Sequence, residues 1–332
     1  NKAISLKPDH TNAYYNMGIA LKEQGKVGEA VEAYNKAISF KPDYADAYSN
    51  MGLALKEQGK VGEAVEAYNK AISLKPDHTN AYYNMGIALK DVKFTAPSSA
   101  YQSIISSILD HKTYVRPSDI SQAAISLLKF ELAIKKVLRQ SSEGKLKQSS
   151  QETVLALSEL PLLLKLMSVC PIADLELEAV LTDMRSSFLS SVLEVSCNLD
   201  VLRFQSTLAL QCFTNEYVYE KTDIETNALE VLEGEVSKAL SNGQQPSPQS
   251  ILCLASYKAL HEYEWCNHLA VTPEIEEVFT RQVREPEQEI RLKSHIPALQ
   301  DITDKVSAKV REQYEESPYP KWINLELAFK PD

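Results

Sequence analysis

The sequence predicts an all-α protein that opens with a solenoid of helical hairpins. The main observation is a tandem repeat, because residues 11–44 recur almost letter for letter as residues 45–78. Within the repeat, apolar residues recur at helical spacing, whereas no stretch of the chain alternates apolar and polar residues as a strand does. A period of about 34 residues with two helices in each unit is typical of a solenoid.

The first helix of the unit has one apolar face. Its members are Tyr14, Met17, Gly18 and Leu21. Gly25 follows, and glycine most easily adopts the left-handed conformation that ends a helix. The second helix stops before Pro42, which lacks the N–H that a helix interior needs. Its buried face consists of Ala30, Tyr34 and Ala37.

Packing between the helices explains the sizes of these residues. Gly18, Ala30 and Ala37 are small where helices cross, because a larger side chain would hold the backbones apart. Tyr34 and Met17 fill the remaining volume. Candidate N-caps of the first helices are the residues that follow each proline, namely Asp9, Asp43 and Asp77.

These residues resemble the consensus of the tetratricopeptide repeat. The matching positions are Tyr14, Met17, Gly18, Leu21, Ala30, Tyr34, Ala37 and Pro42. The resemblance covers residues 1 to about 92 and implies an α-superhelix whose concave surface binds proteins or peptides. Asn1 falls within the second helix of a repeat, so we expect the parent protein to continue upstream. This half repeat leaves an apolar stacking face that a second copy of the chain could cover.

Polar residues on the first helices are the candidate peptide-binding site. Asn16, Asn50 and Asn84 recur at one position and are expected to form a ladder along the concave groove. An amide offers both a donor and an acceptor, which suits a peptide bond. The repeats of O-GlcNAc transferase, which these resemble, hold extended peptides with an asparagine at this position. The alternative is that each asparagine bonds only the next repeat or water.

Further candidates share the concave side with the ladder. They are Asn12, Tyr15, Ile19, Lys22, Asp46, Ser49, Leu53, Lys56, Asn80, Tyr83, Ile87 and Lys90. The lysines are positioned to hold acidic groups of a ligand. An acidic residue directly follows each of them, however, so a solvated face of mixed charge is an equally good interpretation.

The third repeat breaks off after its first helix, and a helical domain is expected from residue 93 to residue 316. Its first helix should cap the solenoid, because a terminal repeat otherwise leaves its stacking face wet. Helices are expected at 98–109, 119–139, 152–169 with an interruption near Pro161, 174–194, 199–219, 223–241, 248–263, 273–284, 286–295 and 301–316, before an extended tail at 317–332. Expected helix starts are Ser118 or Asp119, the capping box of Thr222 with Glu225, and Thr272 with Pro273.

Two stretches of this region carry a second resemblance. Residues 211–218 and 310–322 are similar to the segment between the repeats and the catalytic domain of bacterial tetratricopeptide-repeat methyltransferases. In that family a Tyr-Pro-x-Trp element, here Tyr319 to Trp322, precedes a Rossmann-like domain that binds S-adenosylmethionine. No glycine follows Gly243, so a Gly-rich cofactor turn is missing. The resemblance implies the target-recognition part of a methyltransferase, with S-adenosylmethionine expected only in a domain outside this chain and no cofactor within it.

Composition excludes some partners and favours a cytoplasmic protein. Eleven lysines balance eleven acidic residues in residues 1–92, so the net charge of −10 falls on the remainder and makes nucleic acid a poor partner. The longest apolar run, residues 160–170, is too short to span a membrane. The five cysteines have no paired spacing, which is typical of reduced core thiols.

No residue pattern predicts catalysis or metal binding. His261, Cys266 and His268 lack a fourth ligand nearby, so they are interpreted as packing residues. Cys212 has no histidine near it in the sequence and is interpreted as a buried thiol. The favoured function is therefore peptide recognition for a methyltransferase. A scaffolding protein without an associated enzyme is the alternative, and an enzyme site in the helical domain is disfavoured.

Overall fold

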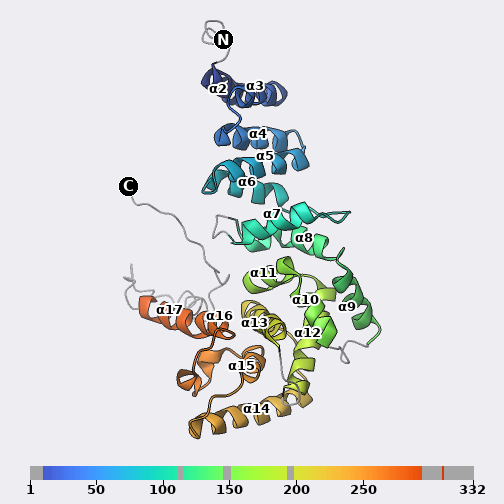
Figure 1. Ribbon diagram of the computed structural model, residues 1–332, viewed down its shortest axis with the longest axis vertical. Helices are drawn as coiled ribbons and strands as arrows, with labels where there is room; N and C mark the ends of the chain where they lie inside the picture. The colour runs from blue at the N-terminus through green and yellow to red at the C-terminus, as the bar shows by residue number, and fades with distance from the viewer. Residues whose placement is uncertain (1–9, 111–114, 145–150, 193–197, 294–308, 310–332) are drawn as a thin grey trace. The chain divides into compact units, whose positions relative to one another are not determined.

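The computed structural model describes residues 10–110, 115–144, 151–192, 198–293 and residue 309. Every regular element in this part of the chain is a helix, and no strand occurs there (Figure 1). The predicted all-α fold is thus confirmed. The chain divides into two compact units with the boundary between Leu127 and Leu128, and each unit is described by itself below. The domain boundary expected after residue 92 stays a prediction.

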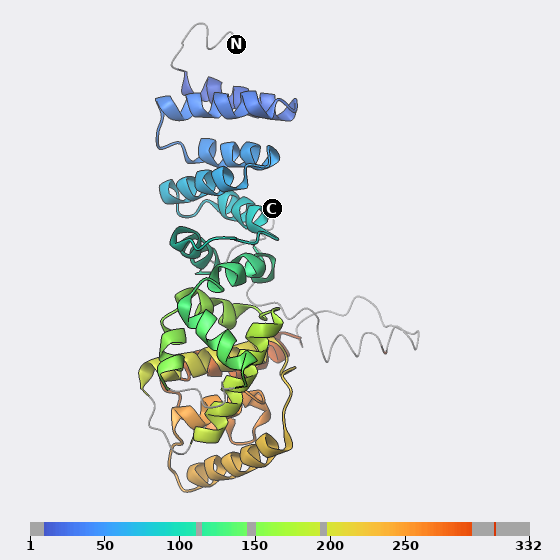
Figure 2. The same cartoon turned by 90° about the vertical axis from the view of Figure 1, so that its right-hand side faces the viewer.

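The first unit begins with the repeat arm, defined here as helices α2 to α6. These helices are α2 (Thr11–Glu23), α3 (Val27–Phe40), α4 (Ala45–Glu57), α5 (Val61–Leu74) and α6 (Thr79–Leu89). Helices α2 with α3 and α4 with α5 form hairpins that lie one above the other in Figures 1 and 2. Helices α7 (Ser99–Asp110) and α8 (Pro117–Leu128) complete the unit.

A tyrosine ring fills the crossing inside each hairpin. A methyl group placed on Gly18 would lie only 2.6 Å from Cε1 of Tyr34, and one on Gly52 would lie 2.7 Å from Cε1 of Tyr68. Both rings are fully buried, as are the small residues Ala30 and Ala37. The two helices therefore approach as closely as they do because the first one lacks a side chain at this point.

The turns inside the hairpins form as predicted, but the caps do not. Gly25 and Gly59 adopt left-handed φ angles of 74° and 76°, which end α2 and α4. The N-caps of α4 and α6 are Tyr44 and His78, each one residue beyond the predicted aspartate. The prediction of Asp43 and Asp77 as caps is wrong because the proline and the aspartate form a turn first, and Asp9 lies outside the described residues.

Helices α7 and α8 take the place of a second helix after α6. Ile105 and Ile108 of α7 are buried, and Tyr101 places its hydroxyl next to Gly62 of α5. Gly86 of α6, the third glycine of the series, packs against Val115 where the earlier copies meet a tyrosine ring. The capping of the solenoid by the first helix of the helical domain stays a prediction.

The second unit is a bundle of shorter helices. They are α9 (Leu132–Ser142), α10 (Gln151–Ser158), α11 (Pro161–Val169), α12 (Leu175–Ser191), α13 (Leu199–Thr214), α14 (Asp223–Ser241), α15 (Pro248–Ala255), α16 (Glu276–Phe279) and α17 (Glu285–Lys293). Two 3-10 turns, Leu260–Glu262 and Cys266–His268, and a π-helical segment, Thr280–Arg284, connect the last of these. The capping box of Thr222 with Glu225 is confirmed.

Two predicted helices are shorter than expected, and side chains from other elements contact the chain where each one ends. The helix expected at 119–139 breaks after Leu128, where Lys129 turns to meet Asp174 at 2.7 Å and Glu176 at 2.8 Å. The helix expected at 248–263 ends at Ala255. There the carbonyl oxygen of Ala255 accepts hydrogen bonds from Tyr217 Oη and Gln282 Nε2.

The predicted start signals at two other helices are also wrong. Helix α8 starts at Pro117, ahead of Ser118 and Asp119, because the N–H of Asp119 already bonds the Arg116 carbonyl. Helix α16 starts only at Glu276, because residues 272–275 close a turn through the N–H of Ile275. The helix expected at 301–316 falls almost wholly outside the described residues.

We predict that Gly52→Ala destabilises the repeat arm by about 1–3 kcal/mol, because the new methyl group collides with the Tyr68 ring. The matched control is Gly28→Ala, also in a helix of the arm, where no atom lies within 4 Å of the added carbon. That change should be neutral or stabilise by about 0.5 kcal/mol through helix propensity. Urea unfolding followed by circular dichroism measures both, and equal midpoints would contradict the crossing described here.

Candidate functional site

The inner wall of the repeat arm is formed by the first helices. Helix α2 contacts α4 and α4 contacts α6, whereas the second helices α3 and α5 have no comparable contact. Stacked hairpins whose first helices are closer together than their second helices curve toward the first helices. The concave side therefore belongs to α2, α4 and α6, which carry all of the predicted peptide-binding residues except Lys90, the residue directly after α6.

The three asparagines of the predicted ladder have different surroundings. Asn16 is exposed, while Asn50 and Asn84 are half-buried. Nδ2 of Asn50 donates a 2.8 Å hydrogen bond to the hydroxyl of Tyr15 in the preceding repeat. The side chains of Asn16 and Asn84 have no hydrogen-bond partner among the described residues. Two of the three amides are thus free for a ligand, and the third is already engaged.

Tyr15 is the centre of an aromatic cluster at the junction of α2 and α4. Its ring centroid lies 4.9 Å from that of Tyr44 and 6.1 Å from that of Tyr34. Burial and the nearby Asp46 carboxylate raise the pKa of Tyr15, so its hydroxyl keeps its proton. The sequence pattern showed Tyr15 but not its bond to Asn50, since the two positions are related only through the stacking of one repeat on the next.

The junction between α4 and α6 uses different chemistry at the equivalent positions. Nε2 of the buried His78 lies 3.1 Å from Oδ1 of Asp46. Ser49, which stands where the other repeats have a tyrosine, is only 4% exposed and offers a ligand little surface. Asp46 therefore lies against the neighbouring repeat, and no pattern in the sequence indicated this contact.

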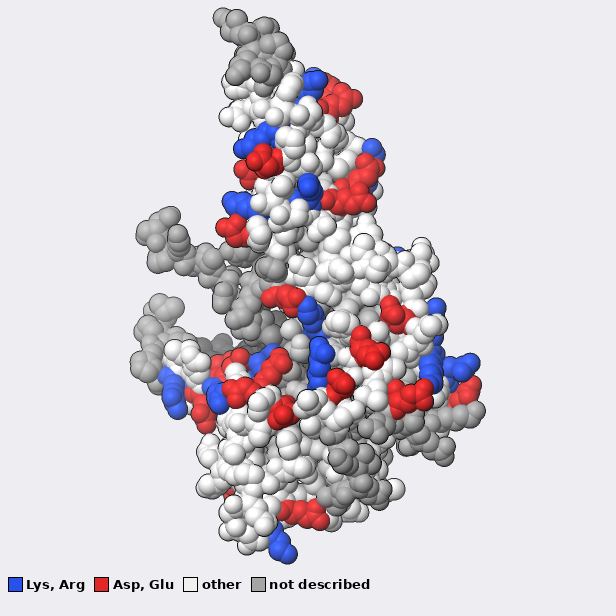
Figure 3. Space-filling view, in the orientation of Figure 1, with Lys and Arg blue, Asp and Glu red and all other residues white. Residues whose placement is uncertain are grey.

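Two of the three lysines on the inner wall have acidic partners. Nζ of Lys22 lies 4.0 Å from Glu57, and Nζ of Lys90 lies 3.4 Å from Asp119. Lys56 is half-buried and has no ion-pair partner among the described residues. Basic and acidic atoms are interspersed along the arm on the face that Figure 3 shows. The wall is thus of mixed charge and does not form a continuous cationic clamp.

The remaining predicted residues divide by exposure. Asn12, Asn80 and Tyr83 are exposed, and Ile19, Leu53 and Ile87 are half-buried. Their placement leaves an accessible strip with apolar and amide groups side by side, because residues three and four apart share one face of a helix.

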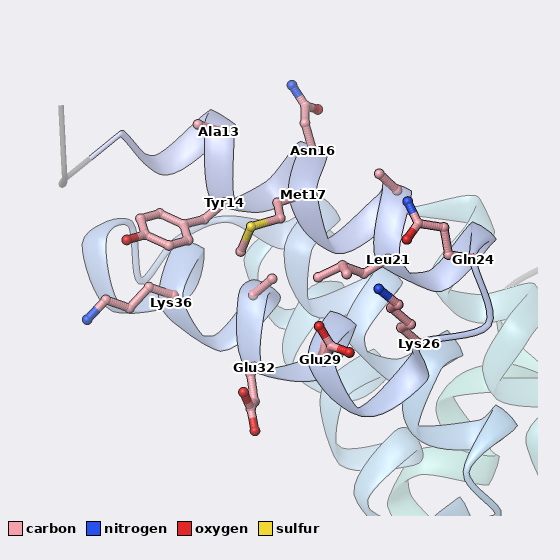
Figure 4. A pocket seen from close by; sticks show the side chains of 12 residues that line it. Ala13, Tyr14, Asn16, Met17, Leu21, Gln24, Lys26, Glu29, Glu32 and Lys36 are labelled. Carbon is pink, nitrogen blue, oxygen red and sulfur yellow. The ribbon is translucent and has the colours of Figure 1, made fainter. Parts of the chain in front are cut away.

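A separate hollow lies at the end of the arm, between α2 and α3 (Figure 4). Its lining is Ala13, Tyr14, Asn16, Met17, Ala20, Leu21, Gln24, Lys26, Glu29, Glu32, Ala33 and Lys36. Asn16 is the one predicted ladder residue in this set, and its side chain points away from Tyr14 and Met17 in Figure 4. The hollow therefore adjoins the inner wall at Asn16.

Comparison with known families agrees with this geometry. Residues 1–32 match a model described as tetratricopeptide repeat, and residues 20–59 and 52–92 match a model described as TPR repeat. Residues 1–92 contain tetratricopeptide repeats. Such repeats commonly bind protein partners. No curated protein matches the chain.

The cysteine and histidine residues of the second unit that were considered for catalysis or metal binding do not form a common site. Cys212 is fully buried, and burial raises its pKa to about 12, so it remains a thiol at neutral pH. His261 and His268 are exposed, whereas Cys266 is buried. Within the described residues, no three His, Cys, Asp or Glu side chains gather as metal ligands would. No described helix has the length and apolarity to cross a lipid bilayer.

A buried arginine holds the loop between α13 and α14. Arg185 is 2% exposed, and its Nη2 donates to the Glu220 carbonyl at 2.6 Å. Its guanidinium lies 4.1 Å from the centre of the Tyr257 ring. Such a contact stabilises a desolvated cation. Within the same stretch, Glu216 and Tyr217 adopt left-handed φ angles of 59° and 57°. These residues belong to the 211–218 motif, so the motif forms a strained, internally bonded turn.

Glu225 connects this loop to Tyr257. Its Oε1 accepts from the Tyr257 hydroxyl at 2.6 Å, and its Oε2 accepts from the N–H and the hydroxyl of Thr222. Burial acts to raise the pKa of Glu225, but these hydrogen bonds outweigh it and hold the pKa below its ordinary value. The carboxylate therefore contributes stability that depends on its charge.

We predict that the second unit loses stability as the pH falls, because a carboxylate with a lowered folded-state pKa stabilises only while it is ionised. The stability is present above the unfolded pKa of about 4.3 and is lost as the pH falls through the folded value. Glu225→Gln should weaken the unit at pH 7 and flatten this dependence. Glu230→Gln, an exposed site on the same helix, is the control. Identical pH profiles of Tm for both variants would contradict the prediction.

Proposed function

We propose that the inner wall of the repeat arm binds an extended polypeptide. The observation that carries the proposal is the pair of unengaged amides, Asn16 and Asn84, on a wall that also offers exposed tyrosine and half-buried aliphatic side chains. An amide side chain can donate to a peptide carbonyl and accept from a peptide N–H. Backbone bonds of this kind hold an extended chain with little regard to its sequence.

The third repeat is the strongest part of the proposed site. Tyr83 is 44% exposed, whereas Tyr15 at the equivalent position is half-buried and bonded to Asn50. Tyr83 and Asn84 therefore offer an exposed ring and an unbonded amide on the same helix. Aromatic and amide groups together are common at protein-binding surfaces because they bury a large area while keeping hydrogen bonds satisfied.

The charges on the inner wall restrict the charge of a ligand less than a groove lined with unpaired lysines would. Lys22 and Lys90 face acidic partners, and only Lys56 is available among the described lysines of the wall. We therefore propose a ligand that is recognised through its backbone and apolar side chains, with at most one acidic side chain near the middle repeat.

A more specific proposal than peptide binding is that the arm recognises the target of an S-adenosylmethionine-dependent methyltransferase. It depends on residues 211–218, which include Glu216 and Tyr217 with their left-handed φ angles, and on residues 310–322, which lie outside the described residues. A scaffolding role without an enzyme uses the same inner wall. The peptide-binding experiment below tests what both have in common.

We predict that Asn84→Ala weakens a bound peptide by about 1 kcal/mol, about fivefold in Kd, because it removes one hydrogen bond. The probe is a peptide selected on the full chain from a random 12-residue display library and measured by calorimetry. Asn84 bonds no other described residue, so folding should not change.

The matched control is Asn69→Ala, an exposed asparagine on the second helix α5, which should leave the affinity unchanged. Asn50→Ala is less informative, because it also breaks the bond to Tyr15. Failure to select any peptide, or equal affinities for the Asn84 and Asn69 variants, would contradict the proposed site.

A further inference from the structure

Helix α14 carries apolar side chains on the face that points to solvent. Ile224 and Val231 are 82% and 60% exposed, and they lie seven residues apart, so they share one face of the helix. The opposite face is buried in the second unit, where Leu232 and Val236 are each 2% exposed. We call the solvent-facing side the outer face of α14, and it consists of Ile224, Glu230, Val231, Gly234, Glu235 and Lys238.

Gly234 leaves a gap in this outer face. It lies three residues after Val231 in the interior of α14, and a methyl group placed on it would have no described atom within 4 Å. Glycine weakens a helix interior relative to alanine. Its advantage is that another chain can approach the backbone closely. Because no described part of this chain makes such an approach, the glycine suits a contact with a different molecule.

The surroundings of the outer face of α14 are acidic. Between residues 216 and 238 the exposed acidic residues are Glu216, Glu220, Asp223, Glu230 and Glu235, against the exposed cations Lys221 and Lys238. Neither Glu230 nor Glu235 has an ion-pair partner among the described residues. Arg185 holds the loop before α14, and the capping box of Glu225 fixes the start of the helix. The charges and the apolar side chains are therefore presented on a fixed surface.

Helix α9 has a similar layout with the opposite charge. Four exposed residues at intervals of three, four and seven share one side of this helix, which we call its outer face. They are Leu132, Lys135, Lys136 and Arg139. Leu132 is 82% exposed, whereas Ile134 and Val137 on the opposite side are each 1% exposed. Nζ of Lys136 lies 3.3 Å from Oε1 of Glu152, and Arg139 has no ion-pair partner among the described residues.

We propose that the outer face of α14 binds the outer face of α9 in a second copy of this chain. Both faces are exposed within one copy, so they do not pair there. The three cations of α9 meet the acidic surface of α14, and complementary charges of this kind select a partner and fix its register. Leu132 fits the gap over Gly234 next to Val231, which removes exposed apolar side chains of both faces from water.

A second copy is the occupant that the charges of the chain itself favour. The chain has a net charge of −10, and α9 concentrates three cations on one side of a helix of 11 residues. Repulsion between two acidic chains acts at long range, but at about 0.15 M salt the Debye length is only about 8 Å. The charges at the contact therefore determine the pairing. This contact involves no residue of the inner wall, so it does not depend on peptide binding.

The test is sedimentation equilibrium of the full chain at about 0.15 M salt, which should show a mass that rises with concentration. Lys135→Glu with Arg139→Glu places like charges opposite α14 and should weaken self-association by about tenfold or more. Glu230→Lys with Glu235→Lys should do the same from the other side. An equimolar mixture of the two variants should restore association. In the mixture the acidic α9 of one variant meets the basic α14 of the other, and the unaltered α9 and α14 also pair.

The matched control is Lys70→Glu with Arg203→Glu, which changes the net charge as much as the α9 variant does, at exposed positions outside both faces. It should self-associate as the unaltered chain does, and all variants should share one Tm because every altered residue is exposed. A chain or a mixture that stays monomeric at every concentration would overturn the proposal, as would an equal loss in the control. A loss in only one of the two variants would assign that face to a different partner and overturn it as well.

Discussion

The repeat arm depends on the contact between a tyrosine ring and a glycine. Tyr34 and Tyr68 lie so close to Gly18 and Gly52 that no Cβ fits between them. The ring hydroxyls are buried and have no hydrogen-bond partner among the described residues, and burial raises the pKa of Tyr34 to about 12. An unpaired hydroxyl costs about 1–3 kcal/mol. The apolar contact of the ring must outweigh that cost, which shows how strongly shape determines this position.

Because the crossings are fixed by shape, the junctions between hairpins are free to differ. One junction joins Tyr15 to Asn50 with a hydrogen bond, and the next places Oδ1 of Asp46 3.1 Å from Nε2 of His78. Tyr15, Asp46 and His78 lie at positions in which the otherwise near-identical repeats vary, whereas Asn50 recurs in every repeat. The polar groups of the first helices can therefore change from one repeat to the next without altering the glycine–tyrosine crossings of the hairpins.

The sequence predicted what depends on local pattern and on repetition. The hairpins, the glycine turns and the capping box of Thr222 follow from residues close together in the chain, and they were found as expected. The helix break at Lys129 and the early end of α15 were missed, because no residue close in sequence indicates them and the side chains that contact both places are distant in sequence. No glycine or proline marks either position.

In the candidate site, too, the sequence predicted the features that depend on the repeat pattern and missed those that depend on a neighbouring repeat. Periodicity placed the asparagines on the first helices, since equivalent residues of a repeat lie on equivalent faces. It did not distinguish the engaged Asn50 from the free Asn84, because that difference arises from the residue that the neighbouring repeat presents, Tyr15 in one case and Ser49 in the other. The position of a polar side chain on the inner wall therefore follows from its own repeat. Whether that side chain is free of other hydrogen bonds depends on the neighbouring repeat.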